Sequence, residues 1–181
     1  MKKNNVIRVA VLFLAASLTM PALLSAQNSK EAKLIADSRN AKAEFIKTDP
    51  LMRNLFDKSP GYVIFPNVGK GGMGVGGAAG NGILFENGKP AGSAKMKQVT
   101  VGFQFGGQAY REVIFFENQS ALDRFKHNNF EFSAQASAVA VTSGVSANVK
   151  YREGVMVFTQ KKGGLMYEAS VGGQKFNYSS F

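Results

Sequence analysis

The chain has 181 residues, with 22 Lys and Arg against 12 Asp and Glu, one His, and neither Cys nor Trp. This length favours a single domain, since domains typically contain roughly 100–200 residues. Without Cys the chain cannot form a disulfide, a thiolate nucleophile or a zinc ribbon, and one His cannot build a multi-histidine metal site. Composition therefore argues against redox and metal chemistry, and we expect no cofactor.

The first residues have the pattern of a secretory signal. A basic start with Lys2, Lys3 and Arg8 precedes an apolar run over residues 9–18, and Ala26 stands where signal peptidase would cut. The apolar run is shorter than the roughly 20 residues that a membrane span needs. We therefore expect a signal that is cleaved after about Ala26; an uncleaved N-terminal anchor is the alternative.

Cleavage would leave residues 27–181, which we expect to form one domain. The signal carries three basic residues, so its removal lowers the formal net charge from +10 to +7. An exported basic protein meets phospholipid headgroups and anionic glycans, so we expect a membrane or lipid partner and no nucleic acid. The expected location is the periplasm or the exterior, peripheral on a membrane.

The mature chain begins with two predicted helices. Residues 29–47 carry apolar side chains at 3.6-residue spacing, which predicts an amphipathic helix. Thr48, Asp49 and Pro50 suit the end of that helix and the start of another, because Pro fits a first helical position and Asp can cap it. The second predicted helix covers residues 51–58.

From Tyr62 the apolar period changes to two, which predicts strands. These cover residues 62–65, 83–86, 99–105, 109–116, 130–136, 145–151, 155–158 and 165–171. Asn87-Gly88 is a strong hairpin signal, and Asn118 should cap a short helix that runs to about His127. The predicted class is α+β: N-terminal helices packed on a strongly twisted antiparallel β meander, with one short helix inserted. A twist of this kind can curl the meander into a barrel-like sheet.

Eight glycines lie between residues 69 and 82, and residues 72–77 formally satisfy G-x-G-x-x-G. A dinucleotide site needs that motif at the start of a helix, whereas here a strand follows. We interpret the glycines as positions where strands bend or backbones approach closely. An alternative is that the bare amides of Gly71 and Gly72, beside Lys70, bind a headgroup phosphate.

A catalytic site is not indicated. Asp123 and His127 stand four residues apart on a predicted helix, so the carboxylate could orient the imidazole. However, the sequence holds no G-x-S-x-G nucleophile motif, and a His at a helix end is typical of a solvated cap. We therefore expect no enzyme activity.

Several basic residues form small clusters. Two lysines at i, i+2 on a strand point to one face, which concentrates positive potential. Solubility or edge protection is the alternative for any single cluster. Because a membrane surface attracts each basic residue by only about 1 kcal/mol, several clusters must share a face to matter. The candidate lipid-binding residues are Lys70, Gly71, Gly72, Lys95, Lys97, Lys150, Arg152, Lys161 and Lys162.

The ordered series of motifs resembles the SYLF lipid-binding domain family. The resemblance is carried by residues 61–66, Lys70 with the glycine run to Gly82, and residues 101–108, 113–125 and 162–172. It covers about residues 30–178 and implies a non-enzymatic module that binds phospholipids. Eukaryotic relatives bind phosphoinositides and some bind actin, but a secretory signal would keep this chain away from actin. Bacterial relatives are often exported or lipid-anchored.

The leading hypothesis is an envelope protein that binds anionic phospholipid through basic clusters and glycine-rich loops. Whether one lipid enters a pocket or a bilayer surface is engaged stays open. An envelope scaffold that binds other proteins is an alternative. A small outer-membrane barrel is a weaker one, since alternate positions back from Phe181 hold Ser179, Asn177 and Lys175 instead of apolar side chains.

Overall fold

The computed structural model describes residues 28–73, 75–101, 108–127, 131–132, 138–162 and 173–181. Contacts divide the chain into two units, Met1–Lys33 and Leu34–Phe181. In the first unit, residues 28–33 are helical. The second unit contains every other element described below. None of the helices in the described part of the chain is long and apolar enough to cross a membrane.

Three predicted helices are confirmed to within about a residue. Residues 34–48 are helical and α2 spans Met52–Lys58. Asp49 lies between them, and its Oδ1 accepts a hydrogen bond of 3.1 Å from the amide of Leu51, just before α2 begins. The inserted helix α3 spans Gln119–Lys126, and the Asn118 side chain accepts a 2.9 Å bond from the Ala121 amide as a cap should.

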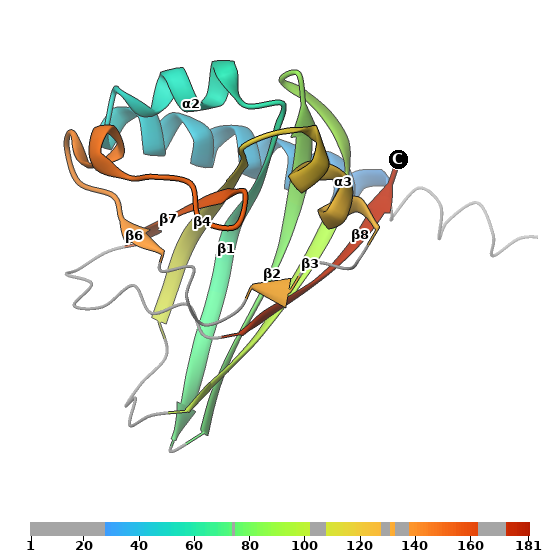
Figure 1. Ribbon diagram of the computed structural model, residues 1–181. Helices are drawn as coiled ribbons and strands as arrows, with labels where there is room; N and C mark the ends of the chain where they lie inside the picture. Colours follow the sequence, from blue (N-terminus) through green and yellow to red (C-terminus); the bar gives the residue numbers. More distant parts are fainter. Residues whose placement is uncertain (1–27, 74, 102–107, 128–130, 133–137, 163–172) are drawn as a thin grey trace, which may run out of the picture. The chain divides into compact units, whose positions relative to one another are not determined.

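One sheet organises the second unit (Figure 1). Its strands, in the order β5-β8-β3-β2-β1-β4-β7-β6, pair antiparallel except for the parallel pair β6–β7. The strands are β1 Gly61–Met73, β2 Val75–Glu86, β3 Lys89–Val101, β4 Gln108–Phe116, β5 Glu131–Phe132, β6 Val139–Ala140, β7 Val155–Lys161 and β8 Gln174–Ser180. The α+β class and the helix inserted after β4 are therefore confirmed.

Two expectations about the sheet are wrong. It is not closed into a barrel, because its described strands have a linear order with β5 and β6 at the edges. The predicted strand over residues 145–151 is instead a 3-10 turn, η1 (Val145–Asn148), followed by residues outside any strand. The predicted strand at 165–171, most of that at 130–136, and the end of that at 99–105 lie outside the described residues.

Two glycine predictions are confirmed. Asn87 and Gly88 join β2 to β3 with φ values of 50° and 75°, the positive pair that a two-residue hairpin turn needs. At Gly82, a Cβ atom would lie 2.6 Å from the carbonyl oxygen of Ile64, so only glycine lets β1 and β2 approach there.

The sheet carries a hydrophobic core on each face. The helix-side core packs residues 34–48 and α2 on the strands through side chains such as Phe45, Phe56 and Ile64. The α3-side core lies on the other face and includes Phe125 of α3 and Phe176 of β8. The ring of Phe176 also lies 5.9 Å, centroid to centroid, from that of Phe65 of β1 in a tilted arrangement, although β3 and β2 separate these strands in the sheet. The sheet is therefore strongly curled about the α3-side core.

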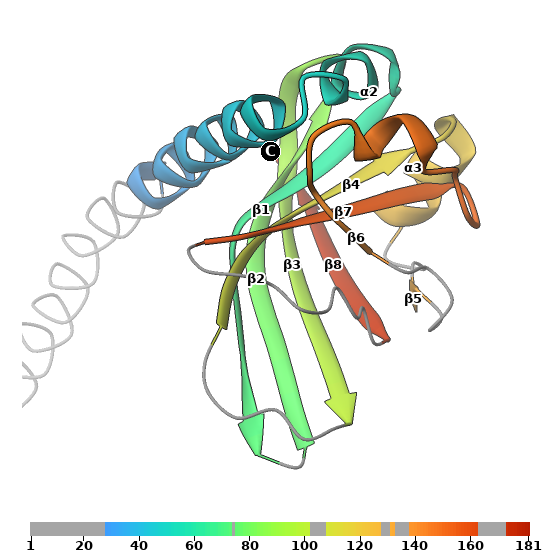
Figure 2. The same ribbon diagram turned by 90° about the vertical axis from the view of Figure 1, so that its left-hand side faces the viewer.

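The long strands β1, β2 and β3 extend together away from the helices to a common far end (Figure 2). The helices cover only the near half of their face, where Ile64, Ile83 and Phe85 are buried. A bulge in β1 between Ile64 and Asn67 changes which residues of this strand face the helix side. The far half of that face consequently presents a different set of residues to solvent.

Candidate functional site

The far half of the helix-side face is exposed, and we call it the distal face. Period-two alternation places on it the odd-numbered residues of all three long strands. They are Asn67, Gly69 and Gly71 of β1, Gly77, Ala79 and Asn81 of β2, and Lys95, Lys97 and Val99 of β3, all exposed. Val99 is 68% exposed, high for an apolar side chain in a strand.

Lysines gather along one side of the distal face. Lys95 and Lys97 point outward, while their neighbours Ala94 and Met96 point into the α3-side core. On the next strand, β8, Lys175 stands directly opposite Lys97. Like charges directly opposite each other destabilise a sheet, so this pair favours an anionic ligand; in the backbone register Glu131 of β5 stands opposite Lys175 on its other side.

The middle of the distal face is flat, because its residues are small. A Cβ atom added at Gly69 or Gly71 would meet nothing within 4 Å. Beside these glycines β2 presents Gly77 and Ala79. The surface next to the lysines is therefore backbone and short side chains, which a ligand or membrane could approach closely.

The glycine-rich stretch lies within β1 and β2, so the glycine-rich loop expected beside Lys70, and the strand limits predicted at residues 65 and 83, are wrong. Gly71 stands opposite Gly77 and Gly72 opposite Gly76 in antiparallel register. No helix begins in the described part of this segment, so the context that a dinucleotide-binding loop requires does not occur there. Gly71 lies on the distal face; Lys70 lies on the opposite face and stands across from Ala78, which belongs to the α3-side core.

The other predicted cationic residues divide between two places. Lys162 reaches the edge of the distal face, where its Nζ donates a 3.3 Å hydrogen bond to Oδ1 of Asn67. Lys161 stands opposite Tyr110, whose side chain belongs to the α3-side core. Lys150 and Arg152 lie on the segment before β7. The fold thus brings Lys95, Lys97 and Lys162 to one face and leaves Lys70, Lys161, Lys150 and Arg152 elsewhere.

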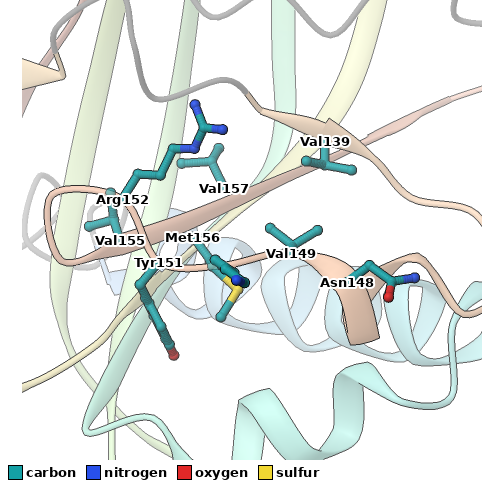
Figure 3. A pocket seen from close by; sticks show the side chains of 9 residues that line it. Val139, Asn148, Val149, Tyr151, Arg152, Val155, Met156 and Val157 are labelled. Atoms are coloured by element: carbon teal, nitrogen blue, oxygen red, sulfur yellow. The ribbon is translucent and has the colours of Figure 1, made fainter.

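Lys150 and Arg152 line a groove of about 440 Å³ beside β7 (Figure 3). The remaining lining residues are Val139, Asn148, Val149, Tyr151, Val155, Met156 and Val157. In Figure 3, Arg152 lies at one end, near Val155, and Asn148 lies at the other. Sequence reasoning grouped the two cations but not the apolar side chains between them, because these come from three separate segments.

The structure gives no support to a catalytic role for His127. Its Nδ1 lies 2.7 Å from the backbone oxygen of Asp123, whereas the Asp123 carboxylate accepts a 2.8 Å bond from Gln119. The carboxylate therefore does not orient the imidazole. Within the described ranges, no group of three or more His, Cys, Asp or Glu side chains is arranged to hold a metal ion.

Sequence reasoning missed two residues of the distal face, Lys175 and Val99. Lys175 lies between the buried residues Gln174 and Phe176, so the period-two pattern of a strand predicts that it is exposed. Its position opposite Lys97 follows from the pairing of β3 with β8, which no local signal reveals.

Two comparisons with known proteins find similar sequences. Residues 97–179, which run from the end of β3 to the last residues of β8, match the Ysc84 family model, described as "Las17-binding protein actin regulator". The chain is also similar to beta cell expansion factor A of Aeromonas veronii, at 26% identity over 166 residues. That alignment covers 90% of this chain and 63% of the relative, so the chain spans less than two thirds of its length. Together with the motif series quoted from the sequence, these matches support the resemblance to the Ysc84/SYLF domain family, whose model covers residues 97–179 of this chain.

Proposed function

We propose that this chain is a non-enzymatic, exported phospholipid-binding protein that engages anionic headgroups through its distal face. The observation that carries the proposal is the group of Lys95, Lys97 and Lys175 on adjacent strands beside a flat, glycine-rich surface. The described residues that β1, β2 and β3 place on that face include no carboxylate, and Glu131 of β5 stands opposite Lys175 in the register. A surface with this charge and shape fits a layer of phosphate groups.

The expected strength follows from the charge. At about 1 kcal/mol per basic residue near an anionic membrane, three lysines supply about 3 kcal/mol. Val99 adds a small apolar contact at the same surface. Such binding is weak, reversible and weakened by salt, since exposed charges are screened within roughly 10 Å at 0.1 M salt.

Vesicle co-sedimentation tests the proposal. We expect the protein to bind vesicles that contain anionic phospholipid, to bind neutral phosphatidylcholine vesicles far less, and to be released as salt rises. The double variant Lys95→Gln/Lys97→Gln should bind roughly 30-fold more weakly, the equivalent of about 2 kcal/mol.

A matched control removes the same charge elsewhere. Lys58 and Lys89 are exposed at the end of the unit where the helices lie, so Lys58→Gln/Lys89→Gln should leave vesicle binding nearly unchanged. Equal losses in the two double variants would show that net charge alone governs binding and would contradict a role for the distal face. Equal binding to neutral vesicles would contradict the electrostatic proposal altogether.

An envelope scaffold is the second candidate function, favoured by the exposure of Val99 on a flat surface. A protein partner that is retained after complete delipidation, and is lost in Lys95→Gln/Lys97→Gln, would support it over lipid binding.

A further inference from the structure

The groove lies beside the first residues of β7, next to the short strand β6. Among the described residues, β6 pairs only with Phe158 and Thr159, so no described strand lies beside the start of β7 on that side. The chain instead leaves β6, crosses the helix side through η1, and returns to β7 by a bridge between Arg152 and Val155. The space between the returning segment and β7 is the groove.

The lining of this groove is mainly apolar with cations at its rim. Val139, Val149 and Tyr151 are half-buried and pack against the helix-side core. Lys150 and Arg152 are exposed, and the residues that line the groove include no carboxylate. An occupant that suits both features has an apolar body and an anionic end.

We propose that the groove binds the acyl chain of one anionic amphiphile, with its acidic group held by Arg152 and Lys150. Its volume of about 440 Å³ falls within the range of roughly 300–1,000 Å³ found for small-molecule sites. Arg suits a carboxylate or phosphate because its planar guanidinium can donate two parallel hydrogen bonds. The proposal shares with the proposed function only the anionic, amphiphilic character of the ligand, since the groove and the distal face use different residues.

Calorimetric titration with single amphiphiles tests the site without a membrane. Octanoate, decanoate and dodecanoate are titrated at pH 8, below their micelle concentrations, and a lauroyl lysophosphatidic acid arm distinguishes a phosphate head from a carboxylate. We expect saturable binding of one molecule per chain, with affinity rising up to roughly fourfold per added CH₂ until the groove is full. Dodecanol, which has the chain without the charge, should bind at least tenfold more weakly than dodecanoate.

Two variants locate the binding. Val149→Trp places an indole in the groove and should abolish most of the binding; because the chain holds no Trp, the emission of this variant reports whether the indole is buried. Lys150→Gln/Arg152→Gln changes only exposed side chains and should weaken dodecanoate binding roughly tenfold or more while leaving dodecanol unchanged. If Val149→Trp fails to fold, the charge variant decides the question.

The distal-face variant separates this proposal from the proposed function. Lys95→Gln/Lys97→Gln should keep full dodecanoate binding while losing vesicle binding, and Lys150→Gln/Arg152→Gln should show the reverse pattern. Absence of saturable binding to any of the amphiphiles, or binding that is equal in folded Val149→Trp, would overturn the groove proposal and leave the vesicle result standing.

Discussion

Nε2 of Gln174 on β8 donates a hydrogen bond of 3.1 Å to Oε2 of Glu112 on β4, across the curled sheet. Glu112 is fully buried, and its Oε1 has no hydrogen-bond partner. Burial raises the pKa of Glu112 to about 7, although the bond from Gln174 acts in the opposite direction. The sheet therefore holds a carboxyl group that is neutral in mildly acidic solution and charged in alkaline solution.

This carboxyl group should make stability depend on pH. The unfolded chain releases the Glu112 proton near pH 4.5 and the folded chain near pH 7, so the folded state binds more protons between these values. Stability therefore falls as pH rises through this window, and the full cost persists above it. At 1.36 kcal/mol per pKa unit, the cost is about 3 kcal/mol at most.

We predict that Glu112→Gln stabilises the protein by about 2 kcal/mol at pH 8 and has little effect at pH 5. The amide keeps the shape of the side chain and removes the buried charge. Urea unfolding at the two pH values measures the difference, with Glu117→Gln as the exposed control. A stabilisation of the same size at both pH values would contradict the pKa assignment.

Two glycines of the sheet, Gly92 in β3 and Gly71 in β1, should respond oppositely to replacement by alanine. A Cβ atom at Gly92 would lie 2.5 Å from the carbonyl oxygen of Ser179, a backbone atom that cannot rotate away. Gly92→Ala should therefore lose about 1–3 kcal/mol, as overpacked sites do. Gly71→Ala meets nothing within 4 Å and should be neutral or stabilising by up to about 1 kcal/mol.

Thermal unfolding of the two alanine variants measures this contrast. A change of 1 kcal/mol shifts the Tm of a chain of this size by roughly 2–4 °C. Similar Tm values for Gly92→Ala and Gly71→Ala would show that the glycines serve strand flexibility rather than close approach.

Local signals in the sequence predicted most of the elements, because caps and turns act within a few residues. Asn118, Asp49 and the Asn87-Gly88 turn each act through backbone groups no more than three positions away. The exception is residues 145–151, in which apolar residues occupy every second position as they do in a strand. There the Asp49 carboxylate accepts a 2.8 Å bond from the Ser146 amide, 97 residues distant, and a 3-10 turn forms instead.

The grouping of the lysines was not predictable, because it depends on one bulge. Without it, Lys70 would share a face with Ile64 and hence with the distal lysines. The register of β1 with β2 gains one residue between Ile64 and Asn67, a stretch that contains Pro66, and this sends Lys70 to the α3-side face. Proline in a strand favours a bulge, but its presence alone does not say whether the register shifts.

Asp49 should contribute more to stability than an ordinary helix cap. Its carboxylate joins the start of α2 to η1, through bonds of 3.1 Å from Leu51 and 2.8 Å from Ser146. Burial by itself would raise the pKa of Asp49, but the surrounding hydrogen bonds, those from Ser146 first, hold the pKa below its usual value. Its contribution is therefore present near neutral pH and lost as pH falls through the folded pKa.

We predict that Asp49→Ala loses about 2–4 kcal/mol at pH 7, because it removes two charge-assisted bonds and leaves the buried Ser146 amide without an acceptor. Asp49→Asn, which retains an acceptor oxygen, should lose less. Chemical unfolding measures both, with the exposed Asp57→Ala expected within about 0.5 kcal/mol of the wild type. If Asp49→Ala lowers the free energy of unfolding no more than Asp57→Ala does, the hydrogen bond between Asp49 and η1 does not stabilise the protein.

Lys97 should show opposite effects on stability and binding. Lys97→Glu places a carboxylate directly opposite Lys175, so a repulsive cross-strand pair becomes attractive and stability should rise by roughly 0.2–1 kcal/mol. The same change reverses one charge of the distal face and should weaken binding to anionic vesicles roughly 30-fold.

The matched control for Lys97→Glu is Lys89→Glu, which makes the same change in net charge on the same strand. Lys89 stands opposite Glu86 at the hairpin, so the variant creates a repulsive pair and should lower stability while vesicle binding stays nearly constant. Tm and vesicle co-sedimentation, measured on both variants, separate the two effects. A lower Tm for Lys97→Glu would show that the Lys97–Lys175 pair is not repulsive. Binding of Lys97→Glu to anionic vesicles that equals that of Lys89→Glu would show that Lys97 does not contribute to vesicle binding.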